Sequence, residues 1–258
     1  MDMPKYVLTI SGSDSSGRAG MQTDNRAIHA CGGYPLNVLT AVTVQGPTGV
    51  ESVELMSADF VEQQLRSMLK SYPVKAIKSG MLGNADIVLR VAQVLSEYPE
   101  VPYVLDPVIC SSSQAVLLEP AGVKFLRSLL MPRAILTTPN LDEVKLLSGF
   151  SDDVWEAGAK LAKGSGQVVL LKGGHASTAN CDDWLFYPDG GRSCHSVERI
   201  QTNNSRGTGC ALSSLIAAHL AREPCELERA IRAAKDQLSC SLYEHRNEAW
   251  QDAGPSFL

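Results

Sequence analysis

The chain has 258 residues, a length that suits one large α/β domain covering residues 1–258. Hydrophobic residues make up 44% and charged residues 20% of the chain, which excludes disordered, collagen-like and long coiled-coil proteins. With 23 basic and 28 acidic residues the formal net charge is −5, so we expect neither nucleic acid nor an anionic membrane as a partner. Binding of small ligands, including anionic ones, is compatible with this charge.

The seven cysteines include no C-x-x-C pair, and residues 1–5 do not begin a signal peptide. We therefore expect reduced thiols and a cytoplasmic location. Apolar runs such as Val101–Leu105 and Val168–Leu171 are far shorter than the roughly 18 residues that a membrane span requires. The sequence thus predicts no membrane-spanning segment.

Strands and helices alternate along the first half of the chain. A β-branched run at Tyr6–Ile10 predicts a strand, the small-residue loop Ser11–Gly20 follows, and a helical pattern runs from Met21 to about Ala30. The same order recurs as an apolar run at Leu36–Val44, a helix at Ala58–Leu69, a strand at Val74–Ile77, a helix at Ala85–Leu95 and a strand at Tyr103–Leu105. This alternation is typical of parallel βαβ units.

The second half continues the alternation and adds one hairpin. We expect helices at Gly122–Leu130, Leu141–Leu147, Val154–Lys163, Gly209–Arg222 and Leu227–Glu244, and strands at Ala134–Thr137 and Val168–Leu171. Two polar-alternating runs, Trp184–Tyr187 and Ser193–Val197, flank a Pro-Asp-Gly-Gly turn and predict a hairpin. The fold class is therefore α/β, with a doubly wound, mostly parallel central sheet flanked by helices, and ligands should bind beyond the carboxyl ends of its strands.

Two glycine-rich turns precede helices and are candidates for anion binding. The loop Ser11–Gly20 either brings backbone N–H groups close to a ligand or is a plain strand-to-helix turn. The segment Asn203–Cys210 opens a helix, so its free N–H groups can hold an oxyanion or phosphate. That helix end should lower the pKa of Cys210 and favour its thiolate, whereas the alternative makes Cys210 a small buried hydrophobe.

Polar residues at three further strand ends each allow two interpretations. Lys172 is either a point charge for a phosphate or a solvated strand-end lysine. Asn140 and Glu143, at i and i+3, suit a hydrated Mg²⁺, but the residues alone favour a capping box. Asp106 before Pro107 is either associated with Mg²⁺ or a turn starter.

Eight short motifs occur in order between Leu8 and Leu242. They are Leu8–Asp14 with Gly17, Ala19 and Gly20; Gln22 with Asp24; Thr40–Gln45; Lys78 with Gly80–Leu82; Val104–Val108; Thr138–Leu141 with Glu143; Leu171–His175; and Gly207–Cys210. In these motifs the chain resembles the hydroxymethylpyrimidine and phosphomethylpyrimidine kinases of thiamine biosynthesis, which are members of the ribokinase-like superfamily. The resemblance covers nearly the whole chain.

The resemblance implies an ATP-dependent phosphorylation of 4-amino-5-hydroxymethyl-2-methylpyrimidine and then of its monophosphate, with ATP and Mg²⁺ bound. It implies that Cys210 is the catalytic base and that the anion hole is formed by Gly207, Thr208 and Gly209. It places in the substrate pocket Gln45, Gly12, Asp24, Met81 and Val108; near ATP Lys172, Thr202 and Thr208; and near Mg²⁺ Asp106, Asn140 and Glu143. A homodimer is also expected, because dimers are common in general and in this family.

The sequence departs from the family pattern at several positions of these motifs. Arg18 replaces a glycine, Ser15 a proline, Ser79 an apolar residue and Arg206 a histidine. The segment Cys110–Gln114 lacks the lysine that the family carries in its flap. Our hypothesis is that Arg18 and Arg206 restore positive charge near the site.

Two rival functions remain open at this stage. One is a pyridoxal kinase, which would phosphorylate another hydroxymethyl group. Gln45 and the Gly-Thr-Gly-Cys form of the turn favour the pyrimidine. The other rival is a catalytically weak homologue that binds the pyrimidine without turnover, which the missing flap lysine suggests. Cys210, Lys172, Asn140 and Glu143 argue against it, since these residues fill the roles that catalysis requires and all are present.

Overall fold

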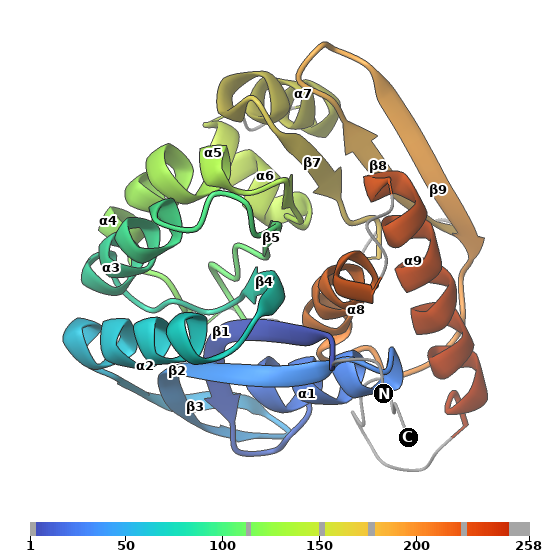
Figure 1. The fold of residues 1–258 in the computed structure, drawn as a ribbon. Coiled ribbons are helices and arrows are strands. Elements are labelled where there is room, and N and C mark those ends of the chain that lie inside the picture. Colours follow the sequence, from blue (N-terminus) through green and yellow to red (C-terminus); the bar gives the residue numbers. More distant parts are fainter. Residues whose placement is uncertain (1–3, 112–114, 150–152, 175–178, 223–225, 248–258) are drawn as a thin grey trace.

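One mixed β-sheet runs through the chain in the strand order β3-β2-β1-β4-β5-β6-β7-β8-β9 (Figure 1). The computed structural model describes residues 4–111, 115–149, 153–174, 179–222 and 226–247. The strands are β1 (Tyr6–Asp14), β2 (Tyr34–Gly46), β3 (Gly49–Leu55), β4 (Val74–Ser79), β5 (Tyr103–Leu105), β6 (Leu136–Thr137), β7 (Val168–Leu171), β8 (Asn180–Phe186) and β9 (Arg192–Glu198). The predicted α/β class is confirmed.

The sheet is parallel from β2 to β7 and antiparallel at both edges. β1 pairs in parallel with β2 on one side and with β4 on the other, whereas β3, β8 and β9 pair antiparallel with their neighbours. Because the chain leaves β1 toward β2 and later returns to β4 on its other side, the sheet has a topological switch point at β1. Such a point opens a crevice at the carboxyl ends of the strands.

Helices cover both faces of the sheet, each over its own apolar core. One face carries α1 (Gly20–Ala30), α8 (Thr208–Arg222) and α9 (Leu227–Glu244), and the other carries α2 (Ala58–Ser71), α3 (Ala85–Ser96), α4 (Pro120–Phe125), a π-helical turn η1 (Leu126–Leu130), α5 (Met131–Arg133), α6 (Leu141–Ser148) and α7 (Val154–Ser165) (Figure 1). Central strands are buried on both faces, which explains their continuous apolar runs.

The helix boundaries follow from local chemistry. Ser57 and Asn84 accept hydrogen bonds from backbone N–H groups in the first turns of α2 and α3. α6 begins with a complete capping box between Asn140 and Glu143, and it ends at Gly149 in the left-handed conformation. Within the described ranges, no helix has the length and hydropathy needed to cross a membrane.

The structure corrects three of the expectations from the sequence. β1 continues through Ser11–Asp14 as strand, where a loop was expected, because these residues pair with β2 around a bulge. β3 was not predicted at all; it forms a hairpin with β2 through the turn at residues 46–49. The expected helix Gly122–Leu130 is divided into α4 and the π-helical turn η1. The first two corrections bring additional backbone to the crevice.

Candidate active site

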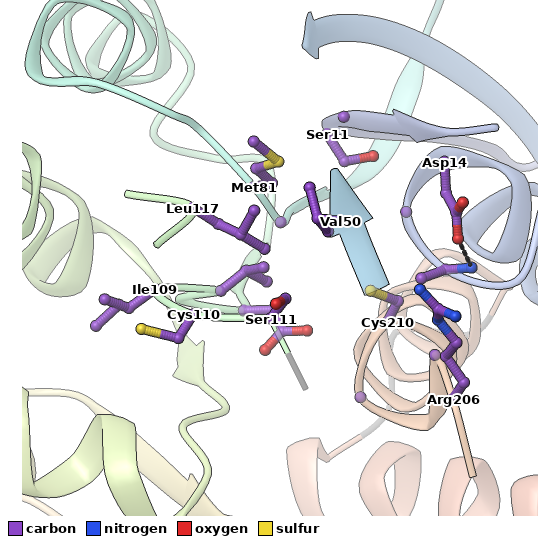
Figure 2. A pocket seen from close by; sticks show the side chains of 18 of the residues that line it. Ser11, Asp14, Val50, Met81, Ile109, Cys110, Ser111, Leu117, Arg206 and Cys210 are labelled. Carbon is purple, nitrogen blue, oxygen red and sulfur yellow. Dashed lines mark hydrogen bonds between the residues drawn. The ribbon is translucent and has the colours of Figure 1, made fainter. Parts of the chain in front are cut away.

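A cavity of about 730 Å³ lies at the carboxyl ends of the parallel strands. Its walls come from the end of β1, the β2–β3 turn, the segments after β4, β5 and β7, and the first turns of α6 and α8. Figure 2 shows Cys210 and Arg206 on one side of it and Met81, Leu117 and Ile109 on the other. The volume is within the range of small-molecule sites. The cavity therefore gathers residues from all five loops singled out in the sequence.

The turn that opens α8 forms the polar side of the cavity. Gly207 has φ of 75°, and a Cβ there would lie 2.1 Å from the carbonyl oxygen of Arg18, so only glycine fits. α8 starts at Thr208, whose Oγ1 donates to the carbonyl of Ser205 at 2.9 Å. A Cβ on Gly209 would lie 3.3 Å from Lys172 Nζ. Backbone N–H groups of this first turn thus face the cavity close to a cation.

Cys210 lines the cavity, but its titration contradicts the sequence expectation. Burial raises the pKa of Cys210 to about 11, and the carboxylates of Asp24 and Asp106 raise it as well. The Lys78 ammonium and a hydrogen bond from the Gly20 backbone N–H act in the opposite direction and do not overcome burial. The expected lowering of this pKa by the helix end is therefore wrong, and the protonated thiol predominates at neutral pH.

Asp24, expected in the substrate pocket, lies behind the cavity wall and is fully buried. Its Oδ1 accepts hydrogen bonds from Lys78 Nζ and Ser214 Oγ, both at 2.8 Å. Its Oδ2 accepts from Thr9 Oγ1 at 2.6 Å and from Ser11 Oγ at 2.8 Å. The carboxylate oxygens of Asp24 therefore accept their hydrogen bonds from groups of the protein itself, and these bonds connect β1, β4 and α8.

Asp106 forms a second buried ion pair, with Lys172, on the cavity wall. Lys172 Nζ donates to Asp106 Oδ1 at 2.8 Å, and Thr138 and Ser213 donate to the same carboxylate. Burial alone would lower the pKa of Lys172, but Asp106 and Glu143 raise it above its ordinary value. Lys172 therefore stays an ammonium in a site suited to bound phosphate groups.

The three expected magnesium residues have different surroundings. Asn140 Oδ1 accepts from the N–H groups of Asp142 and Glu143, both at 2.9 Å, so it acts as the helix cap. Glu143 accepts from the backbone N–H groups of Ile109 and Asn140, and burial raises its pKa. Among the described residues, no group of three or more His, Cys, Asp or Glu side chains could hold a metal. The cavity-lining carboxylates of Asp106 and Glu143 fit a Mg²⁺ ion that keeps several waters and also binds phosphate.

Four of the five expected substrate residues line the cavity. Gln45 Oε1 accepts from Thr43 Oγ1 at 3.1 Å, which fixes the orientation of its amide. A Cβ on Gly12 would lie 3.1 Å from Met81 Sδ, so these two residues pack in close contact. Val108 has φ of 42° and is the one non-glycine residue with positive φ among those described.

Of the remaining expected residues, some line the cavity and others do not. Thr202 lies outside the cavity lining, and its Oγ1 accepts from the Asn204 N–H at 3.0 Å. Arg206 lines the cavity and Arg18 does not, although both were expected to bring charge to it. Of the flap segment Cys110–Gln114, residues 112–114 lie outside the described ranges, and Cys110 and Ser111 line the cavity.

Sequence reasoning missed a group of cavity residues and one buried network. The missed cavity residues include Pro47, Thr48, Val50, Leu117, Asp142 and Leu146, whereas Ser13, Asp14 and Ser205 belong to segments that were singled out without being named individually. The turn Gly46–Gly49, followed by Val53 and Leu55 alternating with polar residues, is a hairpin signal that was available. The pairing of Lys78 with Asp24 joins residues far apart in the chain, so no local pattern could have indicated it.

Comparison with known proteins agrees with this geometry. The family model described as phosphomethylpyrimidine kinase matches residues 14–255. The hydroxymethylpyrimidine/phosphomethylpyrimidine kinase of Haemophilus influenzae is 35% identical over 264 residues, covering 99% of this chain and 97% of its own.

Two solved structures share the fold over nearly the whole chain. The pyridoxal kinase of Bacillus subtilis in its ADP complex has a TM-score of 0.86 and 32% identity, covering 94% of this chain and 93% of its own. The phosphomethylpyrimidine kinase of Clostridium difficile 630 has a TM-score of 0.78 and 30% identity, covering 92% of this chain and 99% of its own.

The fold and the cavity together define a kinase of the ribokinase-like class, a phosphotransferase with its site at the switch point of an open α/β sheet. Within that class, the chain belongs to the phosphomethylpyrimidine kinase family.

Proposed function

We propose that this protein transfers the γ-phosphoryl group of ATP to the hydroxymethyl group of 4-amino-5-hydroxymethyl-2-methylpyrimidine, and then a second phosphoryl group to the resulting monophosphate. The observation that carries the proposal is the meeting of the Gly207–Cys210 turn, the Lys172–Asp106 pair and Gln45 on one cavity. Phosphoryl transfer requires mainly positioning and stabilisation of charge, and this arrangement offers both.

The two sides of the cavity suit the two substrates. Gln45 can both donate to and accept from an aminopyrimidine edge, and the apolar side chains of Met81 and Val108 line the same space. Toward β6 and β7, Lys172 is placed to neutralise nucleotide phosphates. Asp106 and Glu143 would hold Mg²⁺ there, largely through water, and the ion would supply further neutralisation of phosphate charge.

Cys210 is the proposed acceptor of the hydroxyl proton. The substrate oxygen forms its bond to the γ-phosphorus as the bond from that phosphorus to the departing ADP oxygen breaks, and the hydroxyl proton goes to Cys210 Sγ. N–H groups of Thr208 and Gly209 are placed to stabilise charge on the transferring group. Because burial raises the pKa of Cys210 to about 11, the reactive thiolate is a minor form at neutral pH and turnover should increase with pH.

Pyridoxal phosphorylation is a second candidate, favoured by one specific observation. The Bacillus subtilis structure with a TM-score of 0.86 is named a pyridoxal kinase. The family model and the Haemophilus influenzae relative favour the pyrimidine over this candidate.

The test is ATP consumption with products identified by mass, using the pyrimidine, its monophosphate and pyridoxal as substrates. Wild-type protein should form the pyrimidine pyrophosphate, and C210A should lose that activity. C240A is the matched control, because Cys240 is an exposed cysteine on α9. Phosphorylation of pyridoxal alone would establish the second candidate, and binding of the pyrimidine without ATP consumption would establish a non-catalytic homologue. Homodimer formation and a cytoplasmic location stay predictions.

A further inference from the structure

Three cationic side chains line the cavity among the residues that the structure describes, and two of them are already paired. Lys78 forms its ion pair with Asp24, and Lys172 forms its ion pair with Asp106, each at 2.8 Å. The charge of each lysine is therefore largely balanced by a carboxylate on the protein. The third cation, Arg206, forms no ion pair with any described residue.

Arg206 is held in place at the edge of the cavity rather than extended into solvent. Its Nη1 donates to the carbonyl oxygen of Gly46 at 2.8 Å, which connects the turn before α8 to the β2–β3 turn. Its Nε is buried and has no hydrogen-bond partner within the described ranges. A buried donor without a partner is costly, and it is satisfied when an acceptor binds beside it.

The neighbouring carboxylate does not take up this charge. Figure 2 shows Asp14 and Cys210 on the same side of the cavity as Arg206. Asp14 Oδ1 accepts from the backbone N–H and the Oγ of Ser16, and Oδ2 accepts from the Ala19 N–H. Asp14 thus organises its own loop, and the guanidinium remains available to an anion from outside the protein.

We propose that Arg206 binds the phosphate group of a phosphorylated substrate and so sets the preference of this site for the monophosphate over the unphosphorylated alcohol. This inference rests on the proposed function. A guanidinium presents donors in a planar fork that matches phosphate oxygens. Arg206 directly precedes the Gly207–Cys210 turn, so a phosphate bound by it lies beside the groups proposed to carry the transfer.

The position of Arg206 assigns it to the acceptor substrate rather than to ATP. Its contact is with Gly46, the neighbour of Gln45 in the β2–β3 turn. Lys172 follows β7, which is separated from β2 by four strands of the sheet, β1, β4, β5 and β6. The Michaelis constant for ATP therefore tests this assignment directly, because an arginine that served the nucleotide would change it.

The experiment compares R206A, R206Q and R206K with the wild-type protein. Alanine removes the charge and the bond to Gly46; glutamine removes the charge and keeps a donor for Gly46; lysine keeps the charge. The control is R127A, since Arg127 is an exposed arginine on η1, outside the cavity lining. kcat/KM is measured with the pyrimidine and with its monophosphate, together with KM for ATP.

R206A and R206Q should lower kcat/KM for the monophosphate about 10- to 100-fold more than for the alcohol, which is the size of a charge-assisted hydrogen bond. R206K should recover part of this difference, and R127A should keep the wild-type ratio. Equal losses with both substrates, an effect confined to KM for ATP, or a wild-type ratio in R206Q would each overturn the proposal. The last result would mean that Arg206 only positions the β2–β3 turn.

A binding measurement separates this proposal from the proposed function. Inorganic phosphate is titrated calorimetrically into wild-type protein and R206Q without any pyrimidine. Weakening by about tenfold or more in R206Q supports the phosphate role even if no pyrimidine is ever phosphorylated. Equal phosphate binding by the two proteins overturns it, whichever substrate the enzyme uses.

Discussion

Removing Lys78 should destabilise the protein strongly, because its partner Asp24 would become an unpaired charge in the interior. Both side chains are fully buried, and Lys78 Nζ lies 2.8 Å from Asp24 Oδ1. At this separation and an effective dielectric constant of about 20, the attraction between the two charges is about 6 kcal/mol, against which the desolvation of both ions acts. We expect K78M to lower the free energy of unfolding by about 3–5 kcal/mol.

The hydrogen bonds that remain in K78M do not compensate the negative charge of Asp24. Thr9, Ser11 and Ser214 donate to its oxygens and would still do so in K78M, but none of them carries charge. In K78M/D24N the interior contains neither charge. The double variant should therefore lose less free energy than the two single variants together, with a coupling of about 1–3 kcal/mol.

The assay is equilibrium unfolding in urea, followed by tryptophan fluorescence and by circular dichroism, whose agreement establishes a two-state transition. An exposed surface pair has no equivalent effect, so R66A serves as the control: Arg66 pairs with Glu62 and Glu97 at the exposed surface. A loss below about 1 kcal/mol in K78M, or strict additivity in the double variant, would refute the reasoning.

Two further predictions concern the turn that opens α8. Because burial raises the pKa of Cys210 to about 11, its alkylation by iodoacetamide, followed by peptide mass spectrometry, should accelerate about tenfold per pH unit from pH 7 to 10; a plateau near pH 7 would contradict this. G207A should destabilise the protein by about 2 kcal/mol or more in urea unfolding and abolish kinase activity, because of its positive φ and the contact with Arg18. G164A, in open space on α7, should instead be neutral or stabilising, and equal behaviour of the two variants would contradict the argument.

The sequence by itself determined most of the secondary structure and the location of the site. Periodicity reports which face of an element is buried, and this is a local property, so the helices Ala85–Ser96 and Leu227–Glu244 were found nearly to their ends. Parallel alternation also placed the ligand site at the carboxyl ends of the strands. The turn Gly207–Cys210 was recognisable because the glycines of the turn and the start of the helix are adjacent in the sequence.

Only the tertiary structure decided the electrostatics of that site. The helix end alone favours a thiolate at Cys210, but burial and two carboxylates, contributed by α1 and by the segment after β5, reverse the direction of the pKa shift. Lys78 meets Asp24 across 54 positions of the chain, and Arg206 meets Gly46 across 160. Desolvation and charge pairing depend on which distant side chains share a low-dielectric space, and that is fixed by packing rather than by neighbours in sequence.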